Sequence, residues 1–256
     1  MAASYNDRGE IFPALRSWRW AAAGAVLFVA TVVAGDFIKS SGPSVPELGI
    51  DAALSRGRDT VLLALSEAIH YGFGPVGSTT LVVLICLYLA FFRRRPVQSL
   101  AFALVIIGGW LAATSAKVLV GRPRPPADVT DPMIIETGNN SFPSGHTAFA
   151  VSLALAVILV LTESKVQRAI ALAGGALFVA LVGFSRMYLG VHYLSDVIGS
   201  VFITAAGVLV VLPLWNRLLG PALPGTRPIR ALQIRGRGRE AREHNPEDSA
   251  TVPPPD

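Results

Sequence analysis

The sequence predicts an all-α membrane protein: a bundle of six transmembrane helices, with a short interfacial helix between the first and second spans. Of its 256 residues, 52% are apolar and only 15% are charged, whereas a soluble domain carries about 25% charged residues. The apolar residues are gathered in long blocks, and the mean hydropathy is +0.53. These observations exclude a disordered chain and argue against an ordinary soluble enzyme.

Six apolar blocks approach the length of about 20 residues that a helix needs to cross a bilayer. The third block contains Lys117 near its end, and the sixth begins at Asp196. A charge within a span is unfavourable in lipid and indicates a functional residue. The blocks cover roughly residues 20–37, 76–92, 99–119, 145–161, 169–185 and 196–215.

The segment 41–75 differs from the spans, because glycine and proline interrupt it near both ends. Val61, Leu65 and Ile69 give its centre an amphipathic pattern, which predicts an interfacial or partly re-entrant helix outside the main bundle. Three regions follow from the whole pattern. We expect a cytoplasmic N-terminal segment over 1–19, a membrane domain over 20–216, and a disordered basic cytoplasmic tail over 217–256.

The basic residues predict the orientation of the chain. With the N-terminus in the cytoplasm, 15 of the 22 Lys and Arg residues lie on the cytoplasmic side, in agreement with the positive-inside rule. This predicts a multi-pass protein of the inner or plasma membrane with both termini cytoplasmic. The same distribution of basic residues accounts for the net charge of +5, so no nucleic-acid partner is expected. The alternative, that the first block is a cleaved signal peptide, would leave the sidedness unchanged.

Polar clusters lie at the ends of the predicted spans, and six spans place them all on the outer face. Lys117, Arg124 and Arg186 are permanent cations that converge from different helices. Such cations repel one another unless an anion joins them, and their donors suit phosphate oxygens. Ser144 and Gly145 open a helix whose free N–H groups and dipole also favour an anion. The pattern predicts a phosphate site.

Two histidines complete this cluster. His192 and Asp196 are four residues apart, so the carboxylate can accept a hydrogen bond from Nδ1 of His192 and leave its Nε2 free to attack phosphorus. His146, on another helix, suits a general acid. The alternatives are packed structural histidines or an iron or zinc site of two histidines and a carboxylate. Three surrounding cations oppose a metal, so we expect neither metal nor cofactor.

This arrangement resembles the type 2 phosphatidic acid phosphatase superfamily, which includes the vanadium haloperoxidases, and in particular its bacterial membrane lipid phosphatases. The resemblance implies a helical bundle of that type and a role for each residue. Lys117, Arg124, Ser144, Gly145 and Arg186 would bind the phosphoryl group, His192 would be the nucleophile, Asp196 its orienting partner and His146 the acid. The matching motifs are Lys117-x6-Arg124-Pro125, Pro143-Ser144-Gly145-His146 and Ser185-Arg186-x5-His192-x3-Asp196.

The resemblance implies metal-independent hydrolysis of a lipid phosphate or diphosphate at the outer face of the membrane, through a phosphohistidine. An undecaprenyl-type polyprenyl diphosphate is the favoured substrate. The alternatives are a phosphatidate or phosphatidylglycerol-phosphate phosphatase, a lipid phosphotransferase of the same fold, and a non-enzymatic lipid-binding or transport protein.

Other polar residues are expected to have ordinary surroundings. We expect Arg122 to be a solvated loop residue, although it could touch a second phosphate. Asp128, Asp131 and Glu136 are expected to face solvent, and His70 to lie in the interface.

Overall fold

The structure, a computed structural model, describes residues 17–136, 138 and 140–219. Within these residues the chain is helical and forms no β-strand. Three π-helical segments, η2 (Tyr88–Phe92), η3 (Val157–Leu161) and η4 (Trp215–Leu219), extend α4, α7 and α9. The α-helices in chain order are α1 (Trp18–Ser41), α2 (Val45–Arg56), α3 (Thr60–Gly72), α4 (Pro75–Leu87), α5 (Pro96–Val120), α6 (Ala127–Thr130), α7 (Gly145–Ala156), α8 (Lys165–Tyr188) and α9 (Leu194–Leu214).

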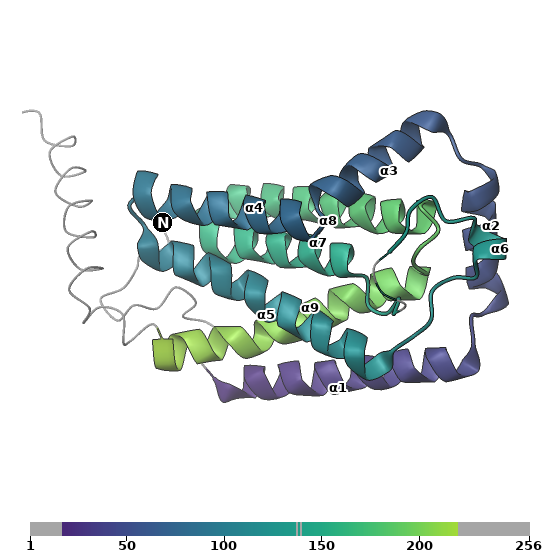
Figure 1. Cartoon of the computed structure of the whole chain (residues 1–256). Helices are drawn as coiled ribbons and strands as arrows, with labels where there is room; N and C mark the ends of the chain where they lie inside the picture. Colours follow the sequence, from purple (N-terminus) through teal and green to yellow (C-terminus); the bar gives the residue numbers. More distant parts are fainter. Residues whose placement is uncertain (1–16, 137, 139, 220–256) are drawn as a thin grey trace, which may run out of the picture.

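The long helices lie side by side and alternate in direction (Figure 1). Five of them, α1, α4 with η2, α5, α8 and α9 with η4, are long and apolar enough to cross a membrane. The helix over Gly145–Leu161 is apolar but shorter. All six predicted blocks are therefore helical, and the chain is a multi-pass membrane protein; the crossing by 145–161 stays a prediction.

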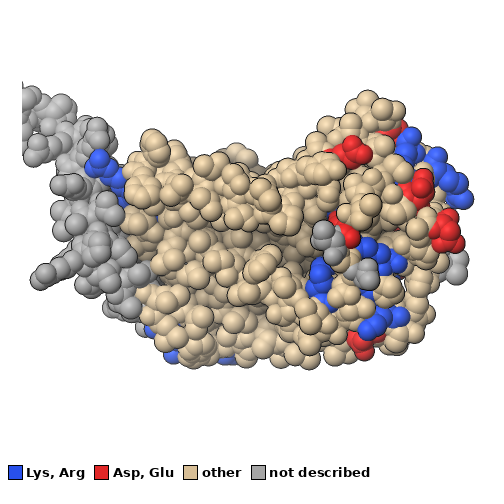
Figure 2. Space-filling view, in the orientation of Figure 1, with Lys and Arg blue, Asp and Glu red and all other residues tan. Residues whose placement is uncertain are grey.

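Helix α9 lies at the centre of the bundle and packs against α1, α5 and α7. Small residues permit the close approach that is common between membrane helices. A Cβ atom added at Gly207 of α9 would lie only 2.4 Å from the carbonyl oxygen of Gly108 on α5. The outer flanks of the bundle are apolar, and Figure 2 shows few charged side chains along them on the face drawn. This distribution suits a lipid environment.

The segment 41–75 forms two helices, where the sequence predicted one. Gly57 follows the last residue of α2, and Asp59 begins α3 by accepting hydrogen bonds from the backbone N–H groups of Val61 and Leu62. An aspartate in this position satisfies N–H groups that would otherwise lack a partner. Arg58, between the two helices, donates to the carbonyl oxygen of Tyr188 at 3.2 Å. Both helices are thereby attached to one end of the bundle.

The described chain begins and ends at the same end of the bundle, opposite α2, α3 and α6 (Figure 1). The basic run at 93–95 lies in the connection at that end, and Lys165 is the first residue of α8 there. Acidic and basic side chains also gather around α2, α3 and α6 at the other end (Figure 2). The predicted N-terminal segment and basic tail lie almost entirely outside the described residues.

The loop before α7 is anchored by Phe142, which is 2% exposed. Its ring lies between α1 and α9, at two glycines, Gly35 and Gly199. Beyond the cis Phe142–Pro143 bond, the backbone N–H of Ser144 donates to the carbonyl oxygen of Asp196 at 3.3 Å. The start of α7 is thus held against the start of α9.

Replacing Gly199 by alanine should disrupt this anchor. The added Cβ would lie 2.3 Å from Cε2 of Phe142, and overpacking of this kind destabilises by about 1–3 kcal/mol. We expect Gly199→Ala to lower the melting temperature of the detergent-solubilised protein. Gly174→Ala is the matched control, because a Cβ there meets no atom within 4 Å. An unchanged melting temperature for Gly199→Ala would contradict the proposed anchoring role.

Candidate active site

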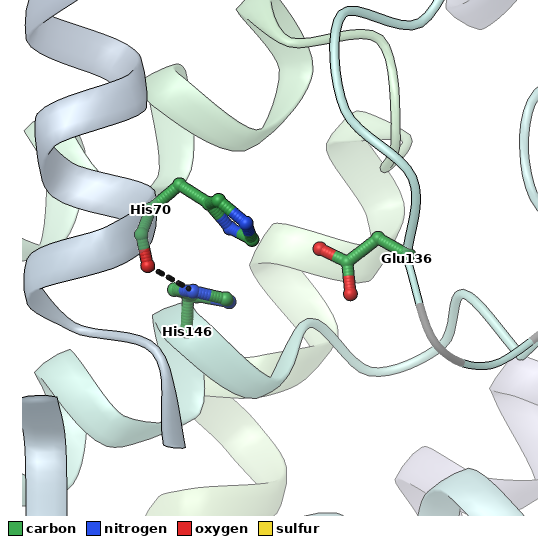
Figure 3. Close-up of side chains that lie close together, drawn as sticks. All are labelled: His70, Glu136 and His146. Carbon is green, nitrogen blue, oxygen red and sulfur yellow. Dashed lines mark hydrogen bonds between the residues drawn. The ribbon is translucent and has the colours of Figure 1, made fainter. Parts of the chain in front are cut away.

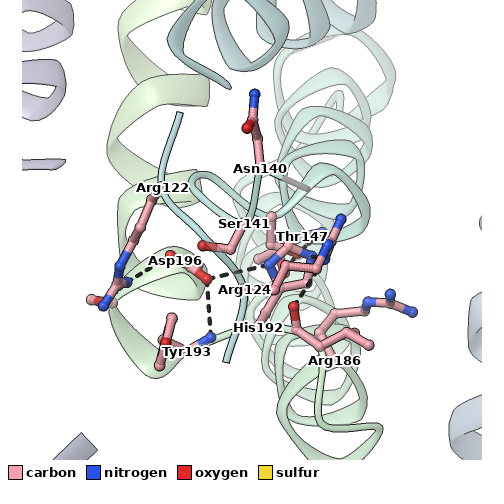
Figure 4. A network of polar contacts seen from close by, with 12 residues as sticks. Arg122, Arg124, Asn140, Ser141, Thr147, Arg186, His192, Tyr193 and Asp196 are labelled. Atoms are coloured by element: carbon pink, nitrogen blue, oxygen red, sulfur yellow. Dashed lines mark hydrogen bonds and ion pairs between the residues drawn. The ribbon is translucent and has the colours of Figure 1, made fainter. Parts of the chain in front are cut away.

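The residues predicted to carry chemistry lie at one end of the bundle, and Figure 4 shows Arg124, Arg186, His192 and Asp196 among them. They are contributed by the ends of helices and by the loops that join them, so each backbone is fixed while the side chains reach inward. The positions are Lys117 in the last turn of α5, Arg124 in the α5–α6 linker, His146 in the first turn of α7, Arg186 in the last turn of α8, His192 just before α9 and Asp196 in its first turn.

His192 and Asp196 form a buried pair. Nδ1 of His192 lies 3.3 Å from Oδ2 of Asp196, which also accepts the backbone N–H of Tyr193 at 3.0 Å. On the other side of the ring, Nη1 of Arg124 lies 3.3 Å from Nε2 of His192. A guanidinium has only donors, so Nε2 is the unprotonated nitrogen and Nδ1 carries the proton. The geometry thus leaves a lone pair on Nε2, as predicted.

Burial lowers the pKa of His192 well below its usual value, and the charges of Arg186, Arg124 and Lys117 lower it further. The imidazole is therefore neutral at physiological pH. All three cations act on the same ring. Lys117 and Arg186 come from the last turns of α5 and α8, whereas Arg124 comes from the α5–α6 linker and not from a helix.

Two of the cations are held by backbone carbonyl groups. Nζ of Lys117 donates to the carbonyl oxygen of Asn140 at 2.7 Å. Arg124 donates to the carbonyl oxygens of Gly138 and Val191 at 2.7 and 2.9 Å. Neutral acceptors fix these side chains without cancelling their charge, so the cations keep their attraction for an anion.

Glu136 lies inside the site, and the expectation that it faces solvent is wrong. Its side chain is 17% exposed, and its carboxylate pairs with Arg186 and, at 3.5 Å, with Arg124. Burial raises the pKa of Glu136, but the charges of Arg186 and Arg124 outweigh burial and hold that pKa below its ordinary value. An ionised carboxylate therefore bridges two of the cations predicted to bind phosphate. Asp128 and Asp131 are exposed, as expected.

His70 also belongs to the site, contrary to the expectation of an interfacial residue. Its carbonyl oxygen, in the last turn of α3, lies 3.1 Å from Nε2 of His146 (Figure 3). Carbonyl groups in the last turn of a helix lack a partner within the helix, and a carbonyl only accepts, so Nε2 of His146 carries a proton. Nη1 of Arg186 lies 3.0 Å from Nδ1 of His70. Helix α3 therefore orients the predicted acid.

His70, Glu136 and His146 have ligand atoms within 4.8 Å of one another, which is close enough to hold a metal ion. Arg186 contacts both His70 and Glu136, however. A guanidinium charge at this position repels a divalent cation and attracts an anion. The donor set consequently fits a phosphate better than a metal.

Ser144 and Gly145 have different roles at the start of α7. The Ser144 hydroxyl is fully buried and caps the helix, accepting from the backbone N–H and the hydroxyl of Thr147 at 3.5 and 3.1 Å. Gly145 is exposed, and a Cβ there would meet no atom within 4 Å. A ligand can therefore approach the first turn of α7 closely at Gly145, while Ser144 shapes the helix start.

Arg122 is the residue that sequence reasoning placed least well. It was expected to be solvated, yet its side chain is 2% exposed and pairs with Asp196 at 2.8 Å and Glu47 at 3.0 Å. Both partners lie more than 70 residues away along the chain. No local spacing could have indicated these contacts.

The fold and the site define a helical membrane protein built for phosphoryl chemistry: a neutral histidine paired with a carboxylate, a second histidine, and three cations. The sequence matches the PAP2 superfamily over residues 97–219. Residues 97–219 therefore carry the features of this superfamily, and the match supports a phosphoric ester hydrolase.

Two comparisons describe its relatives. The chain is 28% identical to phosphatidylglycerophosphatase B of Bacillus subtilis (strain 168) over 157 residues, which is 58% of this chain and 75% of that protein. The fold is similar to the crystal structure of a transmembrane PAP2 type phosphatidylglycerolphosphate phosphatase from Bacillus subtilis, with a TM-score of 0.63 and 23% identity. That alignment covers 76% of this chain and 96% of the other.

Removing the charge of Glu136 should strengthen anion binding. A phosphate must displace this carboxylate from Arg186 and Arg124, and hydrogen bonds to charged groups contribute about 1.5–3 kcal/mol. We expect Glu136→Gln to lower the inhibition constant of inorganic phosphate by about tenfold or more. Asp131→Asn is the matched control, since its carboxylate is 82% exposed and pairs only with Arg58 among the described residues. Equal inhibition constants in wild type and Glu136→Gln would show that the carboxylate does not compete.

Proposed function

We propose that this chain hydrolyses a lipid phosphate without a metal, at the extracytoplasmic end of the bundle and through a phosphohistidine at His192. The observation that carries the proposal is the unprotonated Nε2 of His192, which faces Arg124, on a ring whose Nδ1 is held by Asp196 and whose pKa is lowered by three cations. An uncharged nucleophile approaches a phosphate anion readily once cations have neutralised that anion.

In the first step, Nε2 of His192 attacks phosphorus and the P–O bond to the lipid breaks. Negative charge on the phosphoryl oxygens is stabilised by Lys117, Arg124 and Arg186, after Glu136 has been displaced. The leaving oxygen takes a proton from Nδ1 of His146, and the lipid alcohol departs. His146 must enter this step as the imidazolium, because its Nε2 keeps its own proton on the carbonyl oxygen of His70. Asp196 stabilises the positive charge that develops on the imidazole of His192.

In the second step, water attacks the phosphohistidine, the P–N bond breaks, and inorganic phosphate leaves. His146 accepts a proton from the attacking water, which restores the acid for the next cycle. Its Nε2 is bonded to the carbonyl oxygen of His70, so Nδ1 is the nitrogen that exchanges protons. An acceptor alcohol in place of water would make the enzyme a phosphotransferase.

A lipid substrate is supported by the surface next to the site. Figure 2 shows the surface hollowed between the α3–α4 edge and α5, with charged side chains at one end of the hollow. Apolar residues of α3, among them Val61 and Leu65, are exposed close by. If the phosphate of a lipid bound at the charged end, the acyl chains of that lipid would lie along the apolar helices.

The orientation rests on the charges at the two ends of the bundle. The basic run at 93–95 and Lys165 lie opposite the site, and the positive-inside rule places that end in the cytoplasm. The described chain also begins and ends there (Figure 1). This supports cytoplasmic termini and a site that faces the outside.

The substrate proposed here is phosphatidylglycerol phosphate, because the curated relative is a phosphatidylglycerophosphatase. An undecaprenyl-type diphosphate, which the sequence alone favoured, is the competing substrate. Both present a terminal phosphate at the membrane surface, so the three cations and His192 would act on either.

Phosphate release by the purified full chain in detergent and EDTA tests the proposal. Phosphatidylglycerol phosphate, a polyprenyl diphosphate and phosphatidate are offered in parallel. We expect metal-independent release that His192→Ala abolishes, because no other group supplies the nucleophile. His146→Ala should lower kcat by about 10²–10⁴-fold, the usual contribution of a general acid.

His244→Ala is the matched control, since it removes a histidine outside the described residues. The wild type should also carry an alkali-stable, acid-labile phosphohistidine during turnover, and His192→Ala should carry none. Turnover by a folded His192→Ala variant would overturn the mechanism. Phosphate transferred to an added alcohol instead of released would indicate a phosphotransferase, and lipid movement without hydrolysis would indicate a transport protein.

A further inference from the structure

We infer that Arg122 is a positioning residue that acts on His192 through Asp196, and that Glu47 of α2 holds Arg122 in place. The inference rests on the proposed function, because it concerns the same nucleophile. Arg122 and Arg124 bracket the His192–Asp196 pair: Arg124 reaches Nε2 of the histidine, and Arg122 reaches the far oxygen of the carboxylate (Figure 4).

The guanidinium of Arg122 is held by three hydrogen bonds and one aromatic ring. Nη1 donates to Oδ1 of Asp196 at 2.8 Å and to Oγ of Ser195 at 2.7 Å, and Nη2 donates to Oε2 of Glu47 at 3.0 Å. Its central carbon lies 3.9 Å from the centre of the Tyr193 ring. These partners belong to α2 and the start of α9, and none is a predicted phosphate ligand. Arg122 therefore supports the nucleophile from behind.

Glu47 links α2 to this network in two ways. Oε1 accepts the backbone N–H of Ser195 at 3.0 Å, in the first turn of α9, where N–H groups have no partner within the helix. Oε2 accepts from Arg122. Glu47 is itself 8% exposed and lies in the capped first turn of α2. One carboxylate thus fixes the start of α9 and the arginine that orients Asp196.

A third carboxylate increases the need for Arg122. Asp51 lies one turn beyond Glu47 and is 2% exposed, and its carboxylate oxygens have no hydrogen-bond partner among the described residues. Burial, and then Glu47 and Asp196, raise its pKa to about 7, against the opposing charge of Arg122. Without Arg122, buried carboxylates would face one another, and one of them would take up a proton. A protonated Asp196 would no longer hold Nδ1–H of His192.

The pH profile of turnover is the readout that separates positioning from structural support. Loss of Arg122 favours protonation of Asp196, so the acidic limb of kcat/KM should move to higher pH. The other charged or titratable groups that face the His192–Asp196 pair stay in place in every variant: Lys117 of α5, Arg124 of the α5–α6 linker, Glu136 before α7, His146 of α7, Arg186 of α8, His70 of α3, and Asp51 of α2.

We expect Arg122→Gln to lower kcat by about 10–100-fold, as for other residues that orient a ligand or nucleophile through a second side chain. KM should change little, because the phosphate-binding cations remain. Arg122→Lys should recover part of kcat, and Glu47→Gln should shift kcat and the acidic limb in the same direction by less. These kcat values, KM values and pH profiles are measured with the full chain in detergent.

Arg58→Gln is the matched control. Arg58 also binds two backbone carbonyl groups and one carboxylate at this end of the bundle, but its partners are Tyr188, Thr130 and Asp131. The Arg58→Gln variant should lower the melting temperature while leaving the acidic limb of kcat/KM unchanged. An equal shift of the acidic limb in Arg58→Gln would overturn the inference, as would a rise in KM alone in Arg122→Gln.

If Arg122→Gln does not fold, the pH profiles of Arg122→Lys and Glu47→Gln test the inference in its place. A shifted acidic limb in both supports the inference, and an unshifted limb in both overturns it. Absence of phosphate release by the wild type would contradict the proposed function instead, so the two failures are distinguishable.

Discussion

The end of the bundle that holds the candidate site depends on the burial of one charged carboxylate. Asp196 is fully buried at the start of α9, where an unpaired charge would be strongly destabilising. One oxygen accepts from Arg122, and the other from Tyr193 and His192. Arg122 requires a second carboxylate, which Glu47 brings from α2. The contacts that make the charge tolerable are therefore the contacts that join α2, α9 and the α5–α6 linker.

The phosphate site follows a second rule of charge balance. Three cations converge on His192, and their mutual repulsion at a membrane surface is reduced only when an anion joins them. In this structure Glu136 supplies that anion by pairing with Arg186 and Arg124. A carboxylate carries less charge than a phosphate monoester and fewer acceptor oxygens. Glu136 can therefore stabilise the cations and still be displaced by a phosphate, which brings more negative charge and more acceptor oxygens.

Local patterns were sufficient to predict the helices and the motif residues. Hydropathy located all six apolar helices, because each block of apolar residues is continuous along the sequence. The four-residue spacing of His192 and Asp196 predicted their contact, although His192 lies just before α9 and not on the same helical turn as Asp196. Hydropathy did not reveal that 41–75 holds two helices, since that depends on the cap at Asp59. Glu136, Arg122 and His70 were misplaced because their partners lie about 50 to 116 residues away.

The position of the site at the end of the bundle follows from backbone hydrogen bonding. Within the hydrocarbon region every N–H and C=O group must be paired inside the protein, so unpaired backbone groups occur where helices begin or end. The start of α7 offers N–H groups near Gly145, and the end of α3 offers the carbonyl of His70 to His146. The start of α7 attracts an anion, and the end of α3 holds the predicted proton donor, His146. Both lie at the same end of the bundle, so the backbone supplies its free groups where the proposed site needs them.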